Sequence, residues 1–227
     1  MKTIFTCVLL GINFCLLAQD TVSMQLDLTE PRVGQEVTLS FPIDFLTQEV
    51  QNQLGDSISV VPSRFGLYNQ GSPFKRTIKF HQPGNYIVGP FRFDINGERI
   101  QTDSQEVVVK EKLPLQEGFW VRLIQNGSGD NEIVLEQQIA DSNVFRDPEG
   151  RMEVTSLVEE PQPGVQFYLS RHAITTVQRG LEQNEVPLHY SFTQYRVVFD
   201  SEVEGITLQP WHFSHLKEEI PSLEIKR

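Results

Sequence analysis

Few residues of this chain have the types and spacing that chemistry requires, and the first to test are two histidines. His212 and His215 lie three positions apart. On a helix or tight turn both rings could face one metal ion, whereas in a strand residues three apart point to opposite sides of the sheet. The sequence ITLQPWHF at 206–213 has the pattern of a strand. We therefore expect ordinary surface or half-buried histidines here, and no shared metal.

A calcium loop is the second possible metal site. Asp141 and Asn143 begin a segment in the way that calcium loops begin, with oxygen-bearing side chains at alternate positions. Such loops need glycine at the sixth position for their sharp turn. Arg146 occupies that position, so we expect no calcium site.

Nucleophile and phosphate-binding motifs are absent from the sequence. The segment nearest to a G-x-S-x-G nucleophile elbow is Gly127-Ser128-Gly129, which lacks the required spacing and lies in a turn-like loop. Neither a Walker loop nor G-x-G-x-x-G occurs. We assign no catalytic, cofactor-binding or metal-binding residue, and we expect a protein that is not an enzyme and needs no cofactor.

Carboxylate pairs are abundant because the protein is acidic. A glycosidase needs two carboxyl groups about 5–10 Å apart in a cleft, and neighbouring positions in turn-like segments do not provide that arrangement. We interpret these pairs as solvated acidic faces; a hydrolase would require a deep cleft with two facing carboxyl groups. The pairs are Glu111/Glu117, Glu159/Glu160, Glu202/Glu204 and Glu218/Glu219.

Four aromatic residues could together form a platform for sugars: Trp120, Trp211, Tyr190 and Tyr195. Aromatic side chains inside alternating strands more commonly pack in the core. A carbohydrate-binding β-sandwich module therefore remains the alternative to a protein-binding module. An indole exposed on a flat face would favour it.

The charge of the chain limits the classes of partner. The formal net charge is −11, and nucleic-acid binding depends on lysine and arginine side chains that neutralise phosphates. We therefore expect no nucleic-acid partner. After the N-terminal segment no apolar stretch has the length of a membrane span, so we expect none in the mature chain.

Residues 1–19 have the pattern of a secretory signal peptide. Lys2 precedes an apolar run over 4–17, and Ala18-Gln19 follows. The run is shorter than the roughly 20 residues of a membrane span, which favours a cleaved signal peptide over the alternative, a retained N-terminal anchor. We predict cleavage near Ala18 or Gln19 and a periplasmic or secreted protein.

Both cysteines lie in that N-terminal segment. Removal of Cys7 and Cys15 would leave a mature chain with no disulfide, no thiolate metal site and no cysteine nucleophile. Lipidation would require a small residue before the cysteine, and Phe14 precedes Cys15. We therefore expect no lipid anchor.

The elements that must position all these residues are strands. Apolar residues alternate at period two, which is typical of strands with one face to the core and one to water. Turn signals such as Pro83-Gly84 and Asn96-Gly97 separate the runs, and Asn-Gly favours a two-residue hairpin. Residues 46–54 are the one helical candidate of the first half. The alternating sets are Met24/Leu26/Leu28, Val37/Leu39/Phe41, Ile78/Phe80, Phe91/Phe93/Ile95 and Val107/Val109.

A break at 110–118 combines charge, proline and glycine, and strand-like runs resume beyond it. The stretch 175–185 fits neither a helix nor a strand clearly. The pattern predicts an all-β protein with two tandem immunoglobulin-like antiparallel β-sandwich domains, 20–112 and 113–227, after the signal peptide.

The closing strands of the first domain resemble a known family. Residues 74–110 carry a Pro-Gly turn at 81–84, a strand entering Gly-Pro at 86–90, the Asn96-Gly97 hairpin, Ser104 and a valine-rich strand at 107–109. This order resembles the BatD, or oxygen-tolerance, family of bacterial envelope proteins, as a short form without the membrane helix of that family.

A weaker likeness covers 165–213, where Pro210-Trp211 replaces the Gly-Pro of the family. The resemblance implies immunoglobulin-like domains, an envelope location and a role in protein assembly, and it brings no chemical residue. We therefore expect a protein-binding module of a cell-envelope complex that works through loops or an exposed sheet edge. Its acidic surface favours a basic patch on the partner.

Overall fold

The computed structural model describes residues 20–42, 47–61, 74–95, 97–126, 128–177, 187–215, 220 and 223–227. Most of these residues lie in strands, which confirms the all-β class. Within this part of the chain no helix has the length and apolar character to cross a membrane. The sequence predictions for residues 1–19, Asn96, Gly127, Glu218, Glu219 and most of 175–185 lie outside the described residues.

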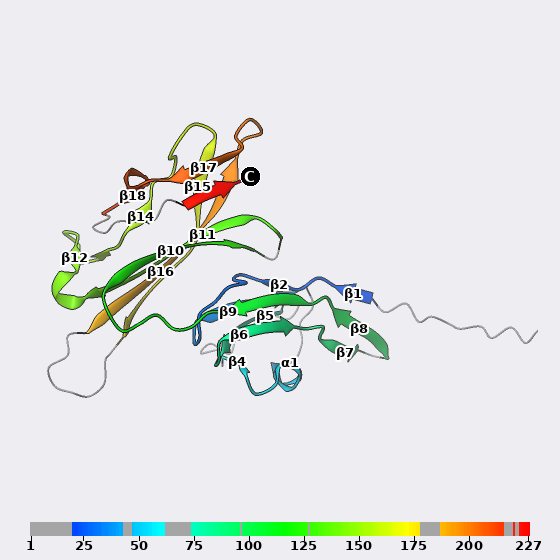
Figure 1. Ribbon diagram of the computed structural model, residues 1–227. Helices are drawn as coiled ribbons and strands as arrows, with labels where there is room; N and C mark the ends of the chain where they lie inside the picture. Colours follow the sequence, from blue (N-terminus) through cyan, green and yellow to red (C-terminus); the bar gives the residue numbers. More distant parts are fainter. Residues whose placement is uncertain are drawn as a thin grey trace, which may run out of the picture.

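Residues 20–110, here called the N-terminal half, form three small sheets (Figure 1). Their strand orders are β2-β3-β5-β4, β6-β9 and β1-β8-β7. The elements are β1 (Asp20–Val22), β2 (Gln25–Leu26), β3 (Glu36–Phe41), α1 (Thr47–Leu54), β4 (Ile58–Val60), β5 (Phe74–Phe80), β6 (Gly84–Val88), β7 (Arg92–Ile95), β8 (Glu98–Thr102) and β9 (Gln105–Val109).

Residues 118–227, the C-terminal half, are organised around a four-stranded antiparallel sheet of order β10-β11-β16-β15. Three two-stranded sheets, β12-β13, β14-β18 and β17-β19, complete this half. The strands are β10 (Gly118–Gln125), β11 (Asn131–Ala140), β12 (Phe145–Arg146), β13 (Met152–Glu153), β14 (Ser156–Leu157), β15 (Val165–Val177), β16 (Leu188–Phe199), β17 (Gly205–Leu208), β18 (Phe213–Ser214) and β19 (Leu223–Lys226).

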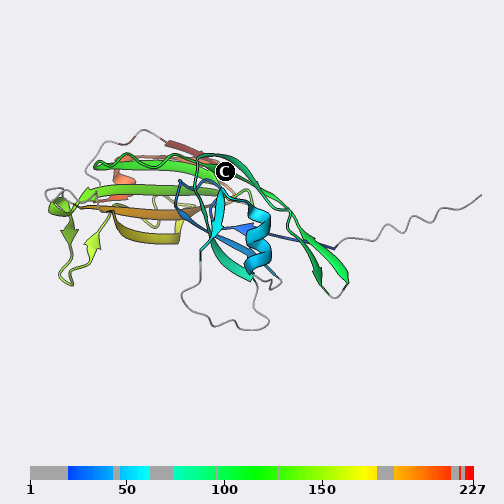
Figure 2. The same cartoon turned by 90° about the horizontal axis from the view of Figure 1, so that it is seen from below.

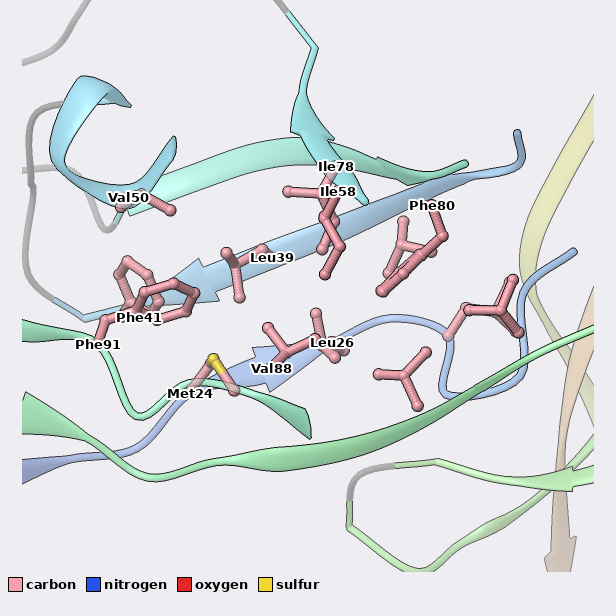
Figure 3. Close-up of a cluster of buried hydrophobic side chains, with 14 of the residues drawn as sticks. Met24, Leu26, Leu39, Phe41, Val50, Ile58, Ile78, Phe80, Val88 and Phe91 are labelled. Atoms are coloured by element: carbon pink, nitrogen blue, oxygen red, sulfur yellow. The ribbon is translucent and has the colours of Figure 1, made fainter. Parts of the chain in front are cut away.

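The alternating apolar residues of the N-terminal half form its core, as their spacing predicts. Figure 3 shows side chains of this cluster pointing toward one another from strands, helix and connecting segments. The helix predicted at 46–54 is confirmed as α1, and its Val50 is buried in the cluster. Buried members include Met24, Leu26, Leu28, Val37, Leu39, Phe41, Ile78, Phe80, Phe91, Phe93, Val107 and Val109.

The main sheet of the C-terminal half is buried on both faces over its two middle strands. Ile133 and Leu135 of β11 belong to the core of the C-terminal half, whereas Val134, between them, belongs to the core of the N-terminal half. Phe192 of β16 joins Val134 on that face. These two strands differ from half-buried strands with one face to water, because the N-terminal half packs on their second face.

The views agree on how the two halves lie. The N-terminal half lies along one face of the sheet that contains β10, β11 and β16. Helix α1 lies on the side of the N-terminal half that faces away from this sheet (Figures 1 and 2). The β7–β8 hairpin extends beyond the rest of this half (Figure 2).

The strand pairing shows the predicted hairpin next to Gly97 and a change of partner at Gly89-Pro90. Strands β7 and β8 pair as an antiparallel hairpin that ends at Ile95 and Glu98, and Gly97, just before β8, adopts φ +86°. At Gly89-Pro90 the chain changes partner, since β6 pairs with β9 and the following β7 pairs with β8. Gly89 adopts φ +83°, and a Cβ there would lie 2.7 Å from the backbone oxygen of Asp103.

These two glycines give a matched test of the fold. We expect Gly97→Ala to cost roughly 1–2 kcal/mol of unfolding free energy, because its backbone is left-handed but its surroundings are open. Gly89→Ala should cost clearly more, since the same strain is joined by a clash with Asp103. Urea denaturation of both variants checks this, and equal losses would contradict the close approach at Gly89.

Candidate functional site

The two histidines lie in different surroundings. The strand predicted over 206–213 is wrong beyond Leu208, because residues Pro210–His212 form a 3-10 turn in which the backbone N–H of Gln209 donates to His212 Nδ1 at 3.1 Å. His212 is buried, and desolvation lowers its pKa. His215 is exposed at φ 55°, with Nδ1 3.8 Å from a carboxylate oxygen of Glu153. In the described part of the chain, no three His, Cys, Asp or Glu side chains are grouped to hold a metal ion.

The residues that resemble the start of a calcium loop form a hydrogen-bonded junction. Asp141–Asn143 is a 3-10 turn, and Asp141 Oδ1 lies 2.7 Å from His189 Nε2. The amide of Asn143 donates to both carboxylate oxygens of Glu117 at 2.9 and 3.0 Å. Glu117 also accepts the backbone N–H of Ala140 at 2.7 Å. The turn therefore fastens the segment before β10 to the end of β11.

The carboxylates that are paired in sequence do not gather in a cleft. Glu117 is engaged at the junction just described, and the others that the structure describes are exposed on the surface. They are Glu111, Glu159, Glu160, Glu202 and Glu204.

The four aromatic residues do not form a single platform. Tyr190 and Tyr195 lie on opposite faces of β16, since they are five positions apart in one strand. The Tyr195 hydroxyl accepts the backbone N–H of Leu157 in the core. Trp120 is half-buried, whereas the side chain of Trp211 is 71 % exposed. Of these four aromatic side chains, the indole of Trp211 is the one open to solvent.

A buried carboxylate between the two halves is the site that sequence reasoning missed. Glu136 of β11 is fully buried, at 0 % exposure. Arg32 of the N-terminal half donates through Nε to both of its oxygens at 2.8 and 2.9 Å. Arg122 Nε of β10 donates at 3.0 Å, and the Tyr190 hydroxyl donates at 2.9 Å.

The chemistry of this cluster fits a structural role. Burial raises the pKa of Tyr190, so its phenol remains a donor to Glu136. Arg122 Nη1 also donates to the backbone oxygen of Glu30 at 2.8 Å, and Arg32 Nη1 to that of Glu111 at 2.9 Å. The cluster therefore connects the N-terminal half, the segment between the halves and the main sheet. A signal was present in the sequence, because Glu132 and Glu136 are four apart in a strand and so share one face.

The outer edge of β15 is the candidate interaction surface. This 13-residue strand ends the sheet order. At the N-terminal end of β15, its outer side is paired with Glu159. The backbone oxygen of Glu159 accepts the backbone N–H of Phe167 at 2.9 Å. Among the described residues, none from outside the sheet makes a backbone hydrogen bond to residues 168–177.

The side chains along this edge are partly apolar. Leu169 is 60 % exposed and Ile174 is 40 % exposed. Their partners on β16 are Tyr195 and Ser191, so both side chains lie on the same face of the sheet. A bulge between Leu169 and Arg171 separates them. The edge thus offers backbone hydrogen-bonding groups beside exposed apolar side chains.

The buried cluster generates a stability prediction. We expect Arg32→Leu to lower the unfolding free energy by about 3 kcal/mol, because Glu136 stays buried with part of its compensation removed. Arg151→Leu is the matched control: Arg151 pairs with Asp147 on the surface and is 75 % exposed, so its loss should change stability little. Chemical denaturation measures both, and equal effects would contradict the role of the cluster.

No protein-family model matches the sequence, and neither a curated protein nor a solved structure shows significant similarity to it. The resemblance to the BatD family therefore stays a prediction.

Proposed function

We propose that this chain is a non-enzymatic protein-binding module that adds an extended segment of its partner to the free edge of β15. In this proposal the protein is exported, lies in the periplasm or outside the cell, and belongs to an envelope complex like those of the BatD family. Its two halves are tandem immunoglobulin-like sandwiches, 20–112 and 113–227. The single observation that carries the binding mode is the long outer edge of β15.

Exposed sheet edges are templates for strand pairing, and proteins usually protect them with lysine, proline or short strands. β15 is 13 residues long and contains neither lysine nor proline. Its sequence VQFYLSRHAITTV has one arginine and β-branched residues toward its end. Such an edge suits β-augmentation, in which backbone hydrogen bonds give affinity and side chains on alternate positions give specificity.

The bulge defines where the partner would lie. Before it, the N–H of Phe167 is already paired with Glu159. After it, the strand continues from Arg171 to Val177. We therefore place the added strand along 171–177, with Ile174 in contact with a partner side chain. Leu169, on the same face before the bulge, extends the apolar contact.

Ile174→Lys tests this surface. Ile174 is exposed at 40 %, so the change should alter stability by less than about 0.5 kcal/mol. A lysine in the proposed contact should weaken the affinity for the partner roughly tenfold, equivalent to about 1.4 kcal/mol. Less partner should then be recovered from envelope extracts at gentle salt. Affinity capture with quantitative mass spectrometry provides the measurement.

Ile87→Lys is the matched control, since Ile87 is 70 % exposed on β6 in the other half. It should leave recovery of the partner unchanged. An equal loss with both variants would place binding elsewhere or make it a general effect of charge. Failure to recover any protein partner with the unaltered chain would count against the proposal as a whole.

A carbohydrate-binding module is the second candidate, favoured by the exposed indole of Trp211. This ring is 71 % exposed and packs edge-on against His212, with ring centroids 5.7 Å apart. A sugar ring could stack on it, although Tyr190 and Tyr195 do not join it, since their hydroxyls bond to Glu136 and to the N–H of Leu157.

Tryptophan fluorescence separates the two candidates. If the chain binds sugars through this indole, titration with oligosaccharides should change the fluorescence of the unaltered protein, and Trp211→Ala should abolish the change because the stacking surface is lost. Trp120→Phe is the control, since Trp120 is half-buried. No saturable change with a panel of envelope oligosaccharides would remove this candidate.

A further inference from the structure

A polar cleft of about 540 Å³ lies between the two halves, apart from the outer edge of β15. That volume falls in the range of small-ligand sites. The N-terminal half contributes residues beside β2, β3 and β9, and the main sheet contributes residues of β11, β15 and β16. Its charged and amide side chains include Asp27, Asp103, Gln105, Glu132, Arg171 and Gln194.

The charge of this cleft is incompletely balanced. Asp27 pairs with Arg171 at 3.1 Å, and Glu36, which also lines the cleft, pairs with Lys79 at 3.1 Å. Asp103 and Glu132 carry two further carboxylates, and no described lysine or arginine lies within ion-pair distance of either. The cleft is therefore negative after its internal pairs are counted.

Two residues that line the cleft each have a buried side-chain oxygen that lacks a hydrogen-bond donor in the described structure. Gln194 is 2 % exposed; its Nε2 donates to the backbone oxygen of Asp27 at 3.0 Å and to Glu132, while its Oε1 has no partner in the described structure. Gln105 is similar, since Nε2 donates to the oxygen of Met24 at 2.8 Å and Oε1 is unpaired.

Exchanging the oxygen and nitrogen positions of either amide would not give these oxygens a hydrogen-bond donor. In both residues the nitrogen already faces acceptors, so an exchange would place oxygen against oxygen. Buried acceptors without donors are rare and unfavourable. A ligand that brings N–H groups would satisfy them.

Glu132 is a buried carboxylate of the cleft without a paired positive charge among the described residues. Its carboxylate is buried in β11, and desolvation is the main reason that its pKa is raised. Hydrogen bonds from Gln194 and Asn126 oppose the rise in pKa, and the charges of Asp130 and Asp27 add to it. A positive charge in the cleft would stabilise the ionised form.

We propose that this cleft binds an organic cation, an ammonium or guanidinium group that donates to Gln105 Oε1, Gln194 Oε1 and the carboxylates of Asp103 and Glu132. A metal ion fits less well, because the described residues bring no three carboxylate or imidazole side chains together for one ion. A sugar also fits less well, since no aromatic ring lines the cleft. The group could belong to a free small molecule or to a basic side chain of a protein.

The test uses n-butylguanidinium as a free guanidinium and acetyl-Gly-Arg-Gly-amide as a peptide-borne one, each titrated calorimetrically into the whole chain. The uncharged n-butylurea is the ligand control, because it keeps the shape of n-butylguanidinium and removes the charge. We expect saturable binding of at least one guanidinium at concentrations up to roughly 10 mM and weaker binding of the urea. Tighter binding of n-butylguanidinium indicates a free ligand, and tighter binding of the peptide indicates a protein side chain.

Glu132→Gln tests the site itself. The amide removes the charge; its one oxygen can still accept from Gln194, and only the 3.3 Å hydrogen bond from Asn126 is given up. Affinity should therefore fall about tenfold while the fold is retained. Glu202→Gln, on an exposed turn outside the cleft, should leave affinity unchanged. Unchanged thermal unfolding and circular dichroism would show that the Glu132 variant is folded.

A pH series gives an independent readout. The cation should bind the ionised form of Glu132 better, so affinity should rise as pH increases through the raised pKa of that carboxyl, and Glu132→Gln should remove this dependence. Other charged groups near it are Asp27, Asp103, Asp130 and Arg171, and they remain in the variant. Absence of saturable binding, or equal affinity in the unaltered chain and Glu132→Gln, overturns the proposal whatever the result at the edge of β15.

Discussion

The burial of the Glu136 carboxylate is the interaction on which the arrangement of the halves depends. A fully desolvated carboxylate is unfavourable unless charge and hydrogen bonds replace its water. Arg122 and Tyr190 supply part of that compensation from neighbouring strands, and Arg32 supplies the rest from the other half. Separation of the halves would therefore remove a partner from Glu136 as well as expose apolar surface.

The main sheet is the element that makes this arrangement possible. One face of β11 is apolar and packs within the C-terminal half, through Ile133 and Leu135. The other face alternates a buried carboxylate with apolar Val134 and meets the N-terminal half. Polar groups on such a contact specify one relative position of the halves, because a displaced partner would leave charges unpaired.

The two proposed binding regions both come from this sheet. Strand β15 ends it, so one side of that strand has no neighbour along 168–177 in the described structure. The polar face of the same sheet meets the N-terminal half incompletely and leaves a cleft with unpaired amide oxygens. An edge and a cleft recognise different groups: the edge offers backbone hydrogen bonds, and the cleft offers negative charge.

Local structure follows from the amino-acid pattern alone. Period-two alternation placed Leu39 and Ile78 in the core, and Asn96-Gly97 predicted a hairpin, because side-chain alternation and turn geometry depend on neighbours along the chain. It failed at residues 209–212, where a 3-10 turn replaces the expected strand. The burial of Glu136 and Gln194 depends instead on tertiary packing, since their partners Arg32 and Asp27 lie over 100 positions away in the chain. Alternation tells which residues share a face, but what covers that face depends on packing between distant segments.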